Sequence, residues 1–394
     1  MSELNKTPSG ERVHIAFFGL RNAGKSSLVN AVTGQSLSVV SDVRGTTTDP
    51  VKKAMELLPV GPVMIIDTPG IDDEGSLGEL RVQKAVEILS KTDVAVLVHG
   101  NADSLNADEK KLIDTFKEKN IPYIIAYNKS DIALKEETRE NEIAVSALTG
   151  ENIYELKELI AKYAKASVNE KVIVSDLIKA GDTVLLVIPI DKAAPKGRLI
   201  LPQQMVLRDI LDSGAIALCC RESELTETLD SLKNPPALVI TDSQVFGKVS
   251  EKLSADIPLT SFSILMARYK GELSILLEGA KALENLKDGD KVLISEGCTH
   301  HRQCGDIGSV KIPAWIENFT KAKPVYSFTS GGEFPSDLSG YALVVHCGGC
   351  MLNEKEMHSR INRCISQNIP IVNYGMAIAH MHGILERSTA VFRK

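Results

Sequence analysis

One eight-residue loop constrains the fold of this chain more than any other feature of its sequence. An apolar run, Val13 to Phe18, leads directly into Gly19-Leu20-Arg21-Asn22-Ala23-Gly24-Lys25-Ser26 and then into a helical pattern. This is a complete phosphate-binding loop, GxxxxGK[ST], between a strand and a helix. Backbone N–H groups and the helix N-terminus would surround the phosphates, while Lys25 supplies charge and Ser26 a hydroxyl for Mg²⁺. We therefore expect an α/β nucleotide-binding domain over residues 10–168.

Two later motifs indicate that the nucleotide carries guanine. In Asp67-Thr68-Pro69-Gly70, which follows an apolar run, Asp67 is placed to hold Mg²⁺ directly or through water, and Gly70 to sense the γ-phosphate. Asn128-Lys129-Ser130-Asp131 also follows an apolar run, and its last carboxylate can accept from the N1 and N2 protons of guanine, which adenine does not offer. Val145-Ser146-Ala147 completes the predicted guanine pocket.

With these elements in this order, the segment resembles GTPases of the Era and TrmE kind, in the translation-factor class. The stretch Gly45-Thr46-Thr47-Thr48-Asp49 matches their first switch. The resemblance implies Thr47 as a Mg²⁺ ligand, with Thr46 as the second choice. After Gly70 the chain carries Ile71, where Ras-like proteins have the glutamine that orients water. Hydrolysis by the Ras route is therefore in doubt.

The TrmE relatives imply a different arrangement for hydrolysis, in which K⁺ replaces an arginine finger. Asn22 matches the loop asparagine that helps to hold this ion. Glu79 is assigned by spacing alone to the acidic residue that assists water, and the alternative is that it belongs to a solvated acidic loop with residues 72–74. The catalytic prediction is Lys25, Thr47, Gly70 and Glu79. The residues predicted to bind nucleotide are Gly19, Asn22, Ala23, Gly24, Lys25, Ser26, Ser27, Thr46, Thr47, Asp67, Gly70, Asn128, Lys129, Asp131, Ser146 and Ala147.

Beyond residue 170, apolar runs alternate with helical patterns in two further segments, residues 172–266 and 267–394. Such alternation is typical of parallel sheets covered by helices. The predicted fold is therefore α/β throughout, with the P-loop domain followed by two smaller α/β domains with mainly parallel sheets. The middle segment carries no histidine and no second phosphate loop, and we interpret it as a dimerisation domain that makes the protein a homodimer.

Two cysteine groups follow strand-like runs in the last segment. Cys298-Thr299-His300 comes after Lys291 to Ser295, and His346-Cys347-Gly348-Gly349-Cys350 comes after Ala342 to Val345. Because the carboxyl ends of parallel strands meet at one edge of a sheet, the two groups are expected to converge. Three cysteines with a histidine suit a structural Zn²⁺, and three thiolates equally suit a 4Fe-4S cube with one iron left for an exchangeable ligand. Spacing alone divides these two interpretations about evenly.

The cysteine groups behind a TrmE-like domain resemble the HydF family, the maturation GTPases of FeFe-hydrogenases, over essentially the whole chain. The resemblance implies a 4Fe-4S cluster held by Cys298, Cys347 and Cys350. His300 and His346 match the family pattern, and either is a candidate for the fourth iron ligand or for a hydrogen-bond donor to a ligand. The family also implies a scaffold that accepts a diiron precursor from two radical-SAM maturases and passes it to the apo-hydrogenase.

Composition narrows the alternatives. The net charge is −6 and no dense basic run is present, which disfavours nucleic-acid binding through a broad basic surface. No apolar run approaches the roughly 20 residues that span a bilayer, and the polar first ten residues are not a signal peptide, so a cytoplasmic protein without a membrane partner is expected.

The main alternative function is that of an Era-like GTPase with a structural zinc domain that binds RNA. A redox enzyme is a third alternative, without a flavin or dinucleotide motif to support it.

Overall fold

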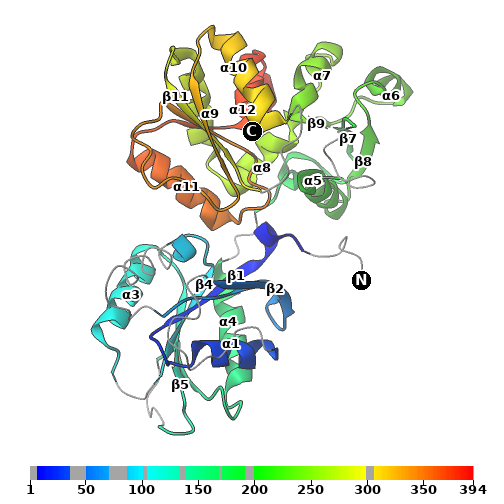
Figure 1. Cartoon of the computed structure of the whole chain (residues 1–394). Helices are drawn as coiled ribbons and strands as arrows, with labels where there is room; N and C mark the ends of the chain where they lie inside the picture. The colour runs from blue at the N-terminus through cyan, green and yellow to red at the C-terminus, as the bar shows by residue number, and fades with distance from the viewer. Residues whose placement is uncertain are drawn as a thin grey trace. The chain divides into compact units, whose positions relative to one another are not determined.

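In the computed structural model the chain divides after residue 170 into two units, Met1–Glu170 and Lys171–Lys394. Figure 1 shows the elements of each unit. The structure describes residues 7–35, 50–70, 87–100, 104–133, 139–167, 171–190, 199–298 and 306–393.

The first unit is built on a six-stranded sheet with the strand order β2-β3-β1-β4-β5-β6. Only β2 runs antiparallel to its neighbour, and all other pairs are parallel. The strands are β1 (Val13–Gly19), β2 (Val51–Leu57), β3 (Gly61–Asp67), β4 (Val94–His99), β5 (Tyr123–Asn128) and β6 (Glu142–Val145), and the helices are α1 (Lys25–Thr33), α3 (Ala107–Glu118) and α4 (Ile153–Ser167), with the short helix η2 (Ser9–Glu11) at the start.

Alternating side chains of the central strands explain why helices cover both faces of this sheet. In β1, Ile15 and Phe17 pack with α1 and α4, whereas Ala16 and Phe18 pack with α3. Successive residues of a strand point to opposite faces, so a continuous apolar run requires a cover on each side. The carboxyl ends of β1, β3, β5 and β6 consequently meet at one edge, where loops carry the polar motifs.

The second unit contains two four-stranded sheets in which every pair of strands is parallel. The strand orders are β10-β9-β7-β8 and β12-β11-β13-β14. The strands are β7 (Thr183–Val187), β8 (Ile216–Cys220), β9 (Leu238–Thr241), β10 (Leu259–Ser261), β11 (Lys291–Glu296), β12 (Val325–Ser330), β13 (Leu343–His346) and β14 (Ile371–Asn373).

Helices connect and cover these strands as Figure 1 shows. They are α5 (Leu201–Asp212), α6 (Leu225–Ser231), α7 (Phe246–Lys252), α8 (Phe262–Lys270), α9 (Leu273–Lys281), α10 (Ile312–Thr320), α11 (Glu354–Ser366), α12 (Tyr374–Met381) and α13 (Leu385–Thr389), with the short helices η3 (Ser175–Leu177), η4 (Ser243–Val245), η5 (Ala282–Asn285), η6 (Ile307–Lys311) and η7 (Ala390–Phe392). The prediction of an α/β protein with mainly parallel sheets is confirmed.

The two sheets of the second unit share one apolar core. A single cluster of buried side chains includes Leu185 and Val239 from the first sheet and Leu293 and Val345 from the second. The boundary expected between residues 266 and 267 falls inside α8, which spans Phe262–Lys270. The sequence pattern marks two sheets correctly, but the helix between them belongs to both because its buried residues join them.

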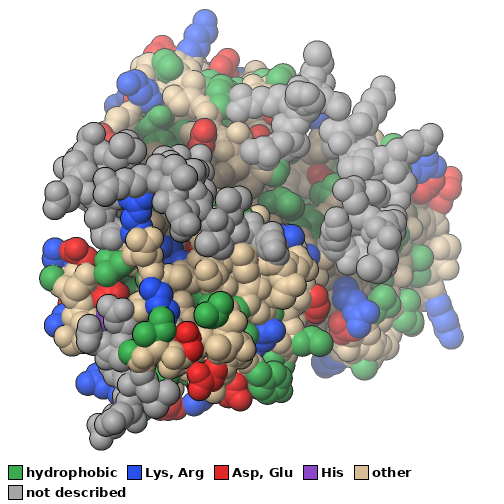
Figure 2. Space-filling view, turned by 60° about the horizontal axis from the view of Figure 1, so that its bottom comes forward, with side chains coloured by type: hydrophobic (Ala, Val, Ile, Leu, Met, Phe, Trp, Pro, Cys, Tyr) green, Lys and Arg blue, Asp and Glu red, His purple; other side chains and the backbone are tan. Residues whose placement is uncertain are grey.

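The surface mixes charges of both signs. On the face that Figure 2 shows, the described Lys and Arg side chains are interspersed with Asp and Glu side chains. Within the described ranges, no helix combines the length and the apolar character that crossing a membrane requires.

Candidate functional site

The loop between β1 and α1 adopts a conformation that only glycine permits at two positions. Gly19 has φ 152° and Gly24 has φ 84°, both in the region that L side chains rarely adopt. A Cβ at Gly19 would collide with the carbonyl oxygen of Val98, and a Cβ at Gly24 with the amide of Asn128. The chain therefore passes close to its neighbours and presents its N–H groups at the start of α1, as a phosphate-binding loop does.

Three side chains at this loop are arranged for a triphosphate and its metal ion. Lys25 is buried, and its Nζ donates to the carbonyl oxygens of Gly19 and Leu20, at 3.2 and 3.4 Å, which holds the ammonium over the loop. Ser26 Oγ donates to Asp67 Oδ2 at 2.7 Å. The other oxygen of Asp67, Oδ1, is buried and has no hydrogen-bond partner among the described residues. A hydroxyl beside an unpaired carboxylate oxygen fits Mg²⁺, which prefers oxygen ligands.

The end of β3 is fixed to β1 immediately after Asp67. Thr68 donates to the Phe17 carbonyl oxygen through both its backbone N–H, at 3.2 Å, and its hydroxyl, at 2.7 Å. This anchors the start of the Asp67-Thr68-Pro69-Gly70 motif beside the phosphate loop. Gly70 is the last described residue before a gap, at the place where a γ-phosphate sensor is expected.

Asn128, at the end of β5, joins the phosphate loop to the loop after β6. Its Nδ2 donates to the Ala23 carbonyl oxygen at 3.0 Å, and its Oδ1 accepts from the Ala147 N–H at 3.1 Å. Lys129 extends across the same loop and donates to the Asn22 carbonyl oxygen at 3.1 Å. These bonds hold the predicted phosphate and guanine elements in one site, although they come from segments more than a hundred residues apart.

The predicted guanine carboxylate is held in place by a hydroxyl. Ser146 Oγ donates to Asp131 Oδ1 at 2.6 Å and accepts from the Thr149 N–H at 3.1 Å. Because the serine has its own donor, its proton points at the carboxylate, and the orientation of Asp131 is set in advance. A second serine, Ser130, donates to Glu151 at 2.8 Å and so steadies the same turn.

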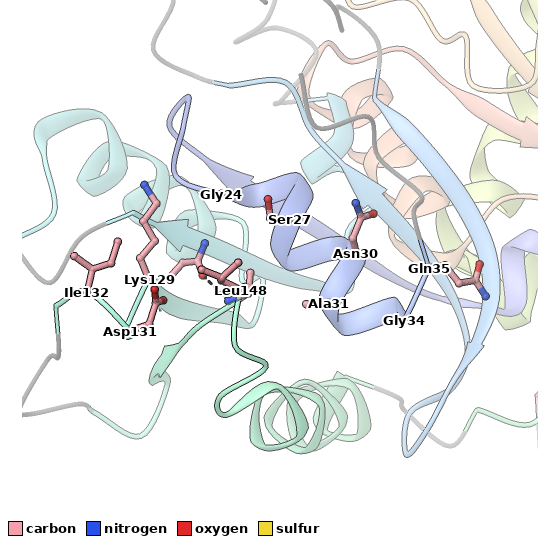
Figure 3. Close-up of a pocket in the computed structure, with 12 residues that line it drawn as sticks. Gly24, Ser27, Asn30, Ala31, Gly34, Gln35, Lys129, Asp131, Ile132 and Leu148 are labelled. Carbon is pink, nitrogen blue, oxygen red and sulfur yellow. Dashed lines mark hydrogen bonds between the residues drawn. The ribbon is translucent and has the colours of Figure 1, made fainter. Parts of the chain in front are cut away.

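A cavity of about 640 Å³ opens in front of these residues, large enough for a nucleoside (Figure 3). Figure 3 shows Lys129, Asp131, Ile132 and Leu148 at one end of it, and residues of α1 at the other. The described lining residues are Gly24, Ser27, Asn30, Ala31, Gly34, Gln35, Asn128, Lys129, Asp131, Ile132, Ala147 and Leu148. Six of the predicted nucleotide residues, Gly24, Ser27, Asn128, Lys129, Asp131 and Ala147, therefore line one cavity.

Four predicted site residues lie outside the described residues: Thr46, Thr47, Glu79 and His300. Asn22, the predicted K⁺ residue, is described. It is exposed at the tip of the phosphate loop and has the left-handed backbone angle φ 59°.

The second candidate site lies at the carboxyl ends of β11 and β13, which pair in parallel so that Ser295 lies opposite His346. Cys347 follows β13, and its N–H donates to the Ser295 carbonyl oxygen at 2.9 Å. The Cys347 sulfur accepts from the N–H of Gly297 at 3.0 Å and from that of Gly349 at 3.4 Å. The first of these donors immediately precedes Cys298, so the two cysteine groups approach each other as expected.

The Cys347 sulfur lies beside two backbone N–H donors in a partly buried position. Burial raises the pKa of this thiol to about 11, although the two backbone N–H donors lower it. A free thiolate is therefore disfavoured here, whereas a metal ion would remove the proton and the N–H groups would stabilise the sulfur charge. Lys270 of α8 donates to the carbonyl oxygens of Cys350 and Leu352, at 3.2 and 2.9 Å, and so fixes the far end of the loop.

His346 is fully buried at the end of β13, and both of its ring nitrogens are engaged. Nδ1 lies 2.7 Å from the Cys347 carbonyl oxygen, and Nε2 lies 3.0 Å from Nη1 of Arg360. Burial and the Arg360 charge lower the pKa of His346 to about 3, so the imidazole is neutral. Of the two roles considered for His346, these contacts favour support of a ligand over ligation of iron.

Complete metal coordination is not visible in the described part of the chain. Among those residues, no group of three or more His, Cys, Asp or Glu side chains is arranged to hold a metal ion. Residues 299–305, which include His300, lie outside the description. The cluster and its fourth ligand therefore stay predictions.

Sequence reasoning missed Arg360 and Lys270. Both are buried, at 3% and 2% exposure. Lys270 contacts the loop that carries Cys347 and Cys350, and Arg360 contacts His346, directly before that loop. A signal for Arg360 was present, because it lies on the same helical face as Met357, Ile361 and Cys364, all of which are buried. A lone arginine on an apolar helical face requires buried partners.

Comparison with known proteins separates the chain into three matched segments. The 50S ribosome-binding GTPase model matches residues 14–129. The hydrogen maturase F dimerization domain matches residues 173–271, and the hydrogen maturase F tetramerization domain matches residues 274–391. The boundary between the last two matches lies next to the end of α8 at Lys270.

Individual relatives match part of the chain. The tRNA modification GTPase MnmE of Endomicrobium trichonymphae is 32% identical over 168 residues, which cover 39% of this chain and 36% of that protein. MnmE of Aquifex aeolicus is 30% identical over 167 residues, 41% of this chain and 37% of that protein. The chain thus matches about a third of the length of these curated relatives.

Solved structures also match part of the chain. A probable GTP-binding protein engB is 24% identical with a TM-score of 0.32, and the match covers 39% of this chain and 100% of that one. The G domain of the T. maritima FeoB iron transporter is 26% identical with a TM-score of 0.29, and the match covers 39% of this chain and 99% of that one.

Proposed function

Since the chain joins a GTPase domain to both further domains of hydrogen maturase F and so belongs to that family, we propose that it hydrolyses GTP in the maturation of FeFe-hydrogenases. In this proposal it holds a 4Fe-4S cluster, accepts a diiron precursor from two radical-SAM maturases and delivers it to the apo-hydrogenase in the cytoplasm. The observation that carries the proposal is the match of residues 173–391 to two domains of one family, directly behind the GTPase domain.

The first site is specific for guanine through the residues at the ends of β5 and β6. Asp131, oriented by Ser146, accepts from the N1 and N2 protons of the base, and Asn128 keeps the base loop at a fixed position from the phosphate loop. An adenine would leave the Asp131 carboxylate without these two donors, at a cost of about 1–3 kcal/mol once the bound base excludes water. The cavity in front of these residues supports this role.

Hydrolysis depends on charge held against the phosphates. Ser26 and Asp67 would hold Mg²⁺, which neutralises charge on the β- and γ-phosphates when it is bound. Lys25 adds a second positive charge from inside the loop. Gly70 would offer its backbone N–H to the γ-phosphate. Asn22 supports a K⁺ ion, so that hydrolysis is faster in K⁺. Thr47 and Glu79 complete the proposed set as Mg²⁺ ligand and water-assisting residue.

Cys298, Cys347 and Cys350 bind the 4Fe-4S cluster in this proposal. The two N–H donors to the Cys347 sulfur support this, because they would stabilise the charge of a metal-bound thiolate. His300 is the preferred fourth ligand, because both nitrogens of His346 already have partners. A fourth ligand that exchanges would leave one iron open, which suits delivery of a cargo more than structural support.

The nucleotide state would then adjust how the scaffold meets its partners. GTP orders the two switches and hydrolysis releases them, so turnover regulates exchange and is not the chemistry of transfer. The segments matched to dimerization and tetramerization domains support assembly of several copies, with the homodimer formed through residues 172–266.

Anaerobic metal analysis of the reconstituted protein tests the proposal most directly. We expect close to four irons and four sulfides per chain, loss of the cluster in Cys347→Ser, and retention in Cys219→Ser, a matched change at an exposed cysteine of β8. Stoichiometric zinc without sulfide would contradict the scaffold and favour the zinc-domain alternative. The loaded protein should also activate apo-hydrogenase, whereas Cys347→Ser should not.

A further inference from the structure

A buried arginine on α11 connects three strand ends at the cysteine site. Arg360 is 3% exposed. Its Nη1 donates to Ser295 Oγ of β11 at 3.4 Å and to His346 Nε2 of β13 at 3.0 Å, and its Nη2 donates to the carbonyl oxygen of Gly331, directly after β12, at 2.7 Å. Glu356, one turn earlier on the same helix, accepts from Nη2 at 2.7 Å and balances the charge.

The arginine also decides which nitrogen of His346 carries the proton. A guanidinium has only donors, so His346 Nε2 must accept and the proton must lie on Nδ1. Nδ1 then donates to the Cys347 carbonyl oxygen at 2.7 Å. A rotation of the ring would break both hydrogen bonds at once, so the backbone of the cysteine loop is fixed by a side chain from a different element.

The planar set of donors on the guanidinium, its fork, matters as well as its charge. Arg360 reaches Ser295, three residues before Cys298, and His346, one residue before Cys347. A lysine ammonium is a single point of charge and lacks the planar set of donors that lets one side chain contact several strand ends. The Phe334 ring also lies against the guanidinium, with 5.2 Å between the ring centroid and Cζ of Arg360.

We propose that Arg360 is a positioning residue for the cysteine site: by tying the ends of β11, β12 and β13 together and acting through His346, it holds the Cys347–Cys350 loop in the geometry that binds the cluster. The inference rests on the proposed function for the identity of the metal group. The loop geometry itself is a property of the protein without metal, and it can be measured separately.

The chain offers a matched control on the same helix. Arg363 donates through Nη1 to the carbonyl oxygens of Phe334 and Pro335, each at 3.0 Å, and also lies over the Phe334 ring. Among the described residues, these side-chain contacts lie in the loop after β12 and include neither Ser295 nor His346. Arg363→Met therefore removes a similar side chain without releasing the cysteine loop.

The first experiment follows thiol alkylation in the metal-free, reduced protein, resolved by peptide mass spectrometry. We expect Arg360→Met to increase the alkylation rate of Cys347 by about tenfold or more, because local opening becomes easier. Cys364, buried on α11, is the internal reference for the helix and should not change. Equal acceleration at Cys364, or no acceleration at Cys347, would overturn the proposal. Arg363→Met should leave Cys347 unchanged.

Arg360→Met also leaves the Glu356 carboxylate buried without its partner, and this alone would destabilise the protein. The double variant Arg360→Met/Glu356→Gln removes this charge, and we expect it to keep the selective exposure of Cys347. Arg360→Lys should not restore protection. If it does, the charge and not the fork positions the loop, and the proposal is wrong in that form.

The second experiment compares cluster binding in the reconstituted full chain. Arg360→Met and His346→Phe should change the electron paramagnetic resonance spectrum of the reduced cluster and accelerate its loss to a chelator, and the double variant should lose the cluster no faster than the worse single variant. Additive losses would contradict action through His346. If the wild-type protein binds no iron and sulfide, the proposed function fails. If it binds them and Arg360→Met behaves like Arg363→Met, only this inference fails.

Discussion

Exchange of Asp131 for asparagine should change which base the first site prefers. The Asp131 carboxylate is held by the 2.6 Å bond from Ser146, which has its own donor in the Thr149 N–H. Asparagine fills the same volume, and the Ser146 hydroxyl can bond either amide atom. The amide, however, offers one acceptor and one donor, whereas the carboxylate offers only acceptors. Xanthine, which carries a carbonyl in place of the N2 amine, matches the amide.

The binding free energy that Asp131→Asn loses for a guanine nucleotide follows from the hydrogen bonds to the base. A hydrogen bond to a charged group contributes about 1.5–3 kcal/mol. The Asp131 carboxylate accepts two such bonds from guanine. In Asp131→Asn, the amide nitrogen faces one of these guanine donors as a second donor, and the remaining bond is weaker because its acceptor is uncharged. A loss of about 3 kcal/mol corresponds to roughly a hundredfold weaker binding of GDP. Xanthosine diphosphate should gain affinity by a similar factor, because its carbonyl accepts from the new amide.

Competition against a fluorescent GDP analogue measures both affinities in one assay. Ser146→Ala is the control, because it removes the orienting hydroxyl but keeps the carboxylate. We expect it to weaken GDP binding by about 1 kcal/mol without a change of base preference. If Asp131→Asn weakens both nucleotides equally, or leaves GDP binding intact, then Asp131 does not read the base.

Three further predictions follow from the charges on the chain. Lys25→Ala should lower GTP turnover by at least about a hundredfold, since its charge is placed over the loop, while iron and sulfide content stays unchanged; loss of iron would show that the domains fold together. GTP hydrolysis should be faster in K⁺ than in Na⁺ at equal ionic strength, and equal rates would remove the K⁺ role of Asn22. Bonds from His358, and secondarily Lys171, lower the pKa of Glu354 from its ordinary 4.5 to about 2. This corresponds to about 3 kcal/mol for a buried group and to about 1 kcal/mol here, because Glu354 is 41% exposed. A lowered folded-state pKa contributes stability that is present above pH 4.5 and lost as the pH falls towards 2, so Glu354→Gln should cost about 1 kcal/mol in urea unfolding of the metal-free protein at pH 7 and nothing near pH 2. An equal cost at both pH values would assign the effect to packing.

Local sequence patterns predicted much of the first unit because its functional residues lie in short motifs directly after strands. The loop from Gly19 to Ser26 and the motif from Asn128 to Asp131 each follow an apolar strand. In a parallel sheet those ends must share one edge. The structure brings the phosphate loop, Asp67 and the guanine residues together there, as this reasoning requires.

The second unit shows where this reasoning ends. The pattern predicted two sheets and the approach of the two cysteine groups. The boundary that it proposes between residues 266 and 267 lies within α8, whose buried side chains belong to two apolar clusters, and periodicity does not show which core a buried helix joins. Lys270, at the end of that helix, holds the cysteine loop from a position 80 residues away in the sequence. A charged residue at a helix end looks like a solvated one until its partners are known.

By itself, the sequence determined the fold class, the phosphate loop, the guanine motif and the convergence of the cysteine groups. Each of these depends on short motifs at the ends of strands, and neighbouring residues in the sequence set their conformation. Only the tertiary structure decided that Asn128 ties the base loop to the phosphate loop and that His346 is engaged by Arg360 and Cys347 at both nitrogens. The physical reason is that a buried polar group must find its partners wherever packing places them, and packing joins residues that local patterns cannot connect.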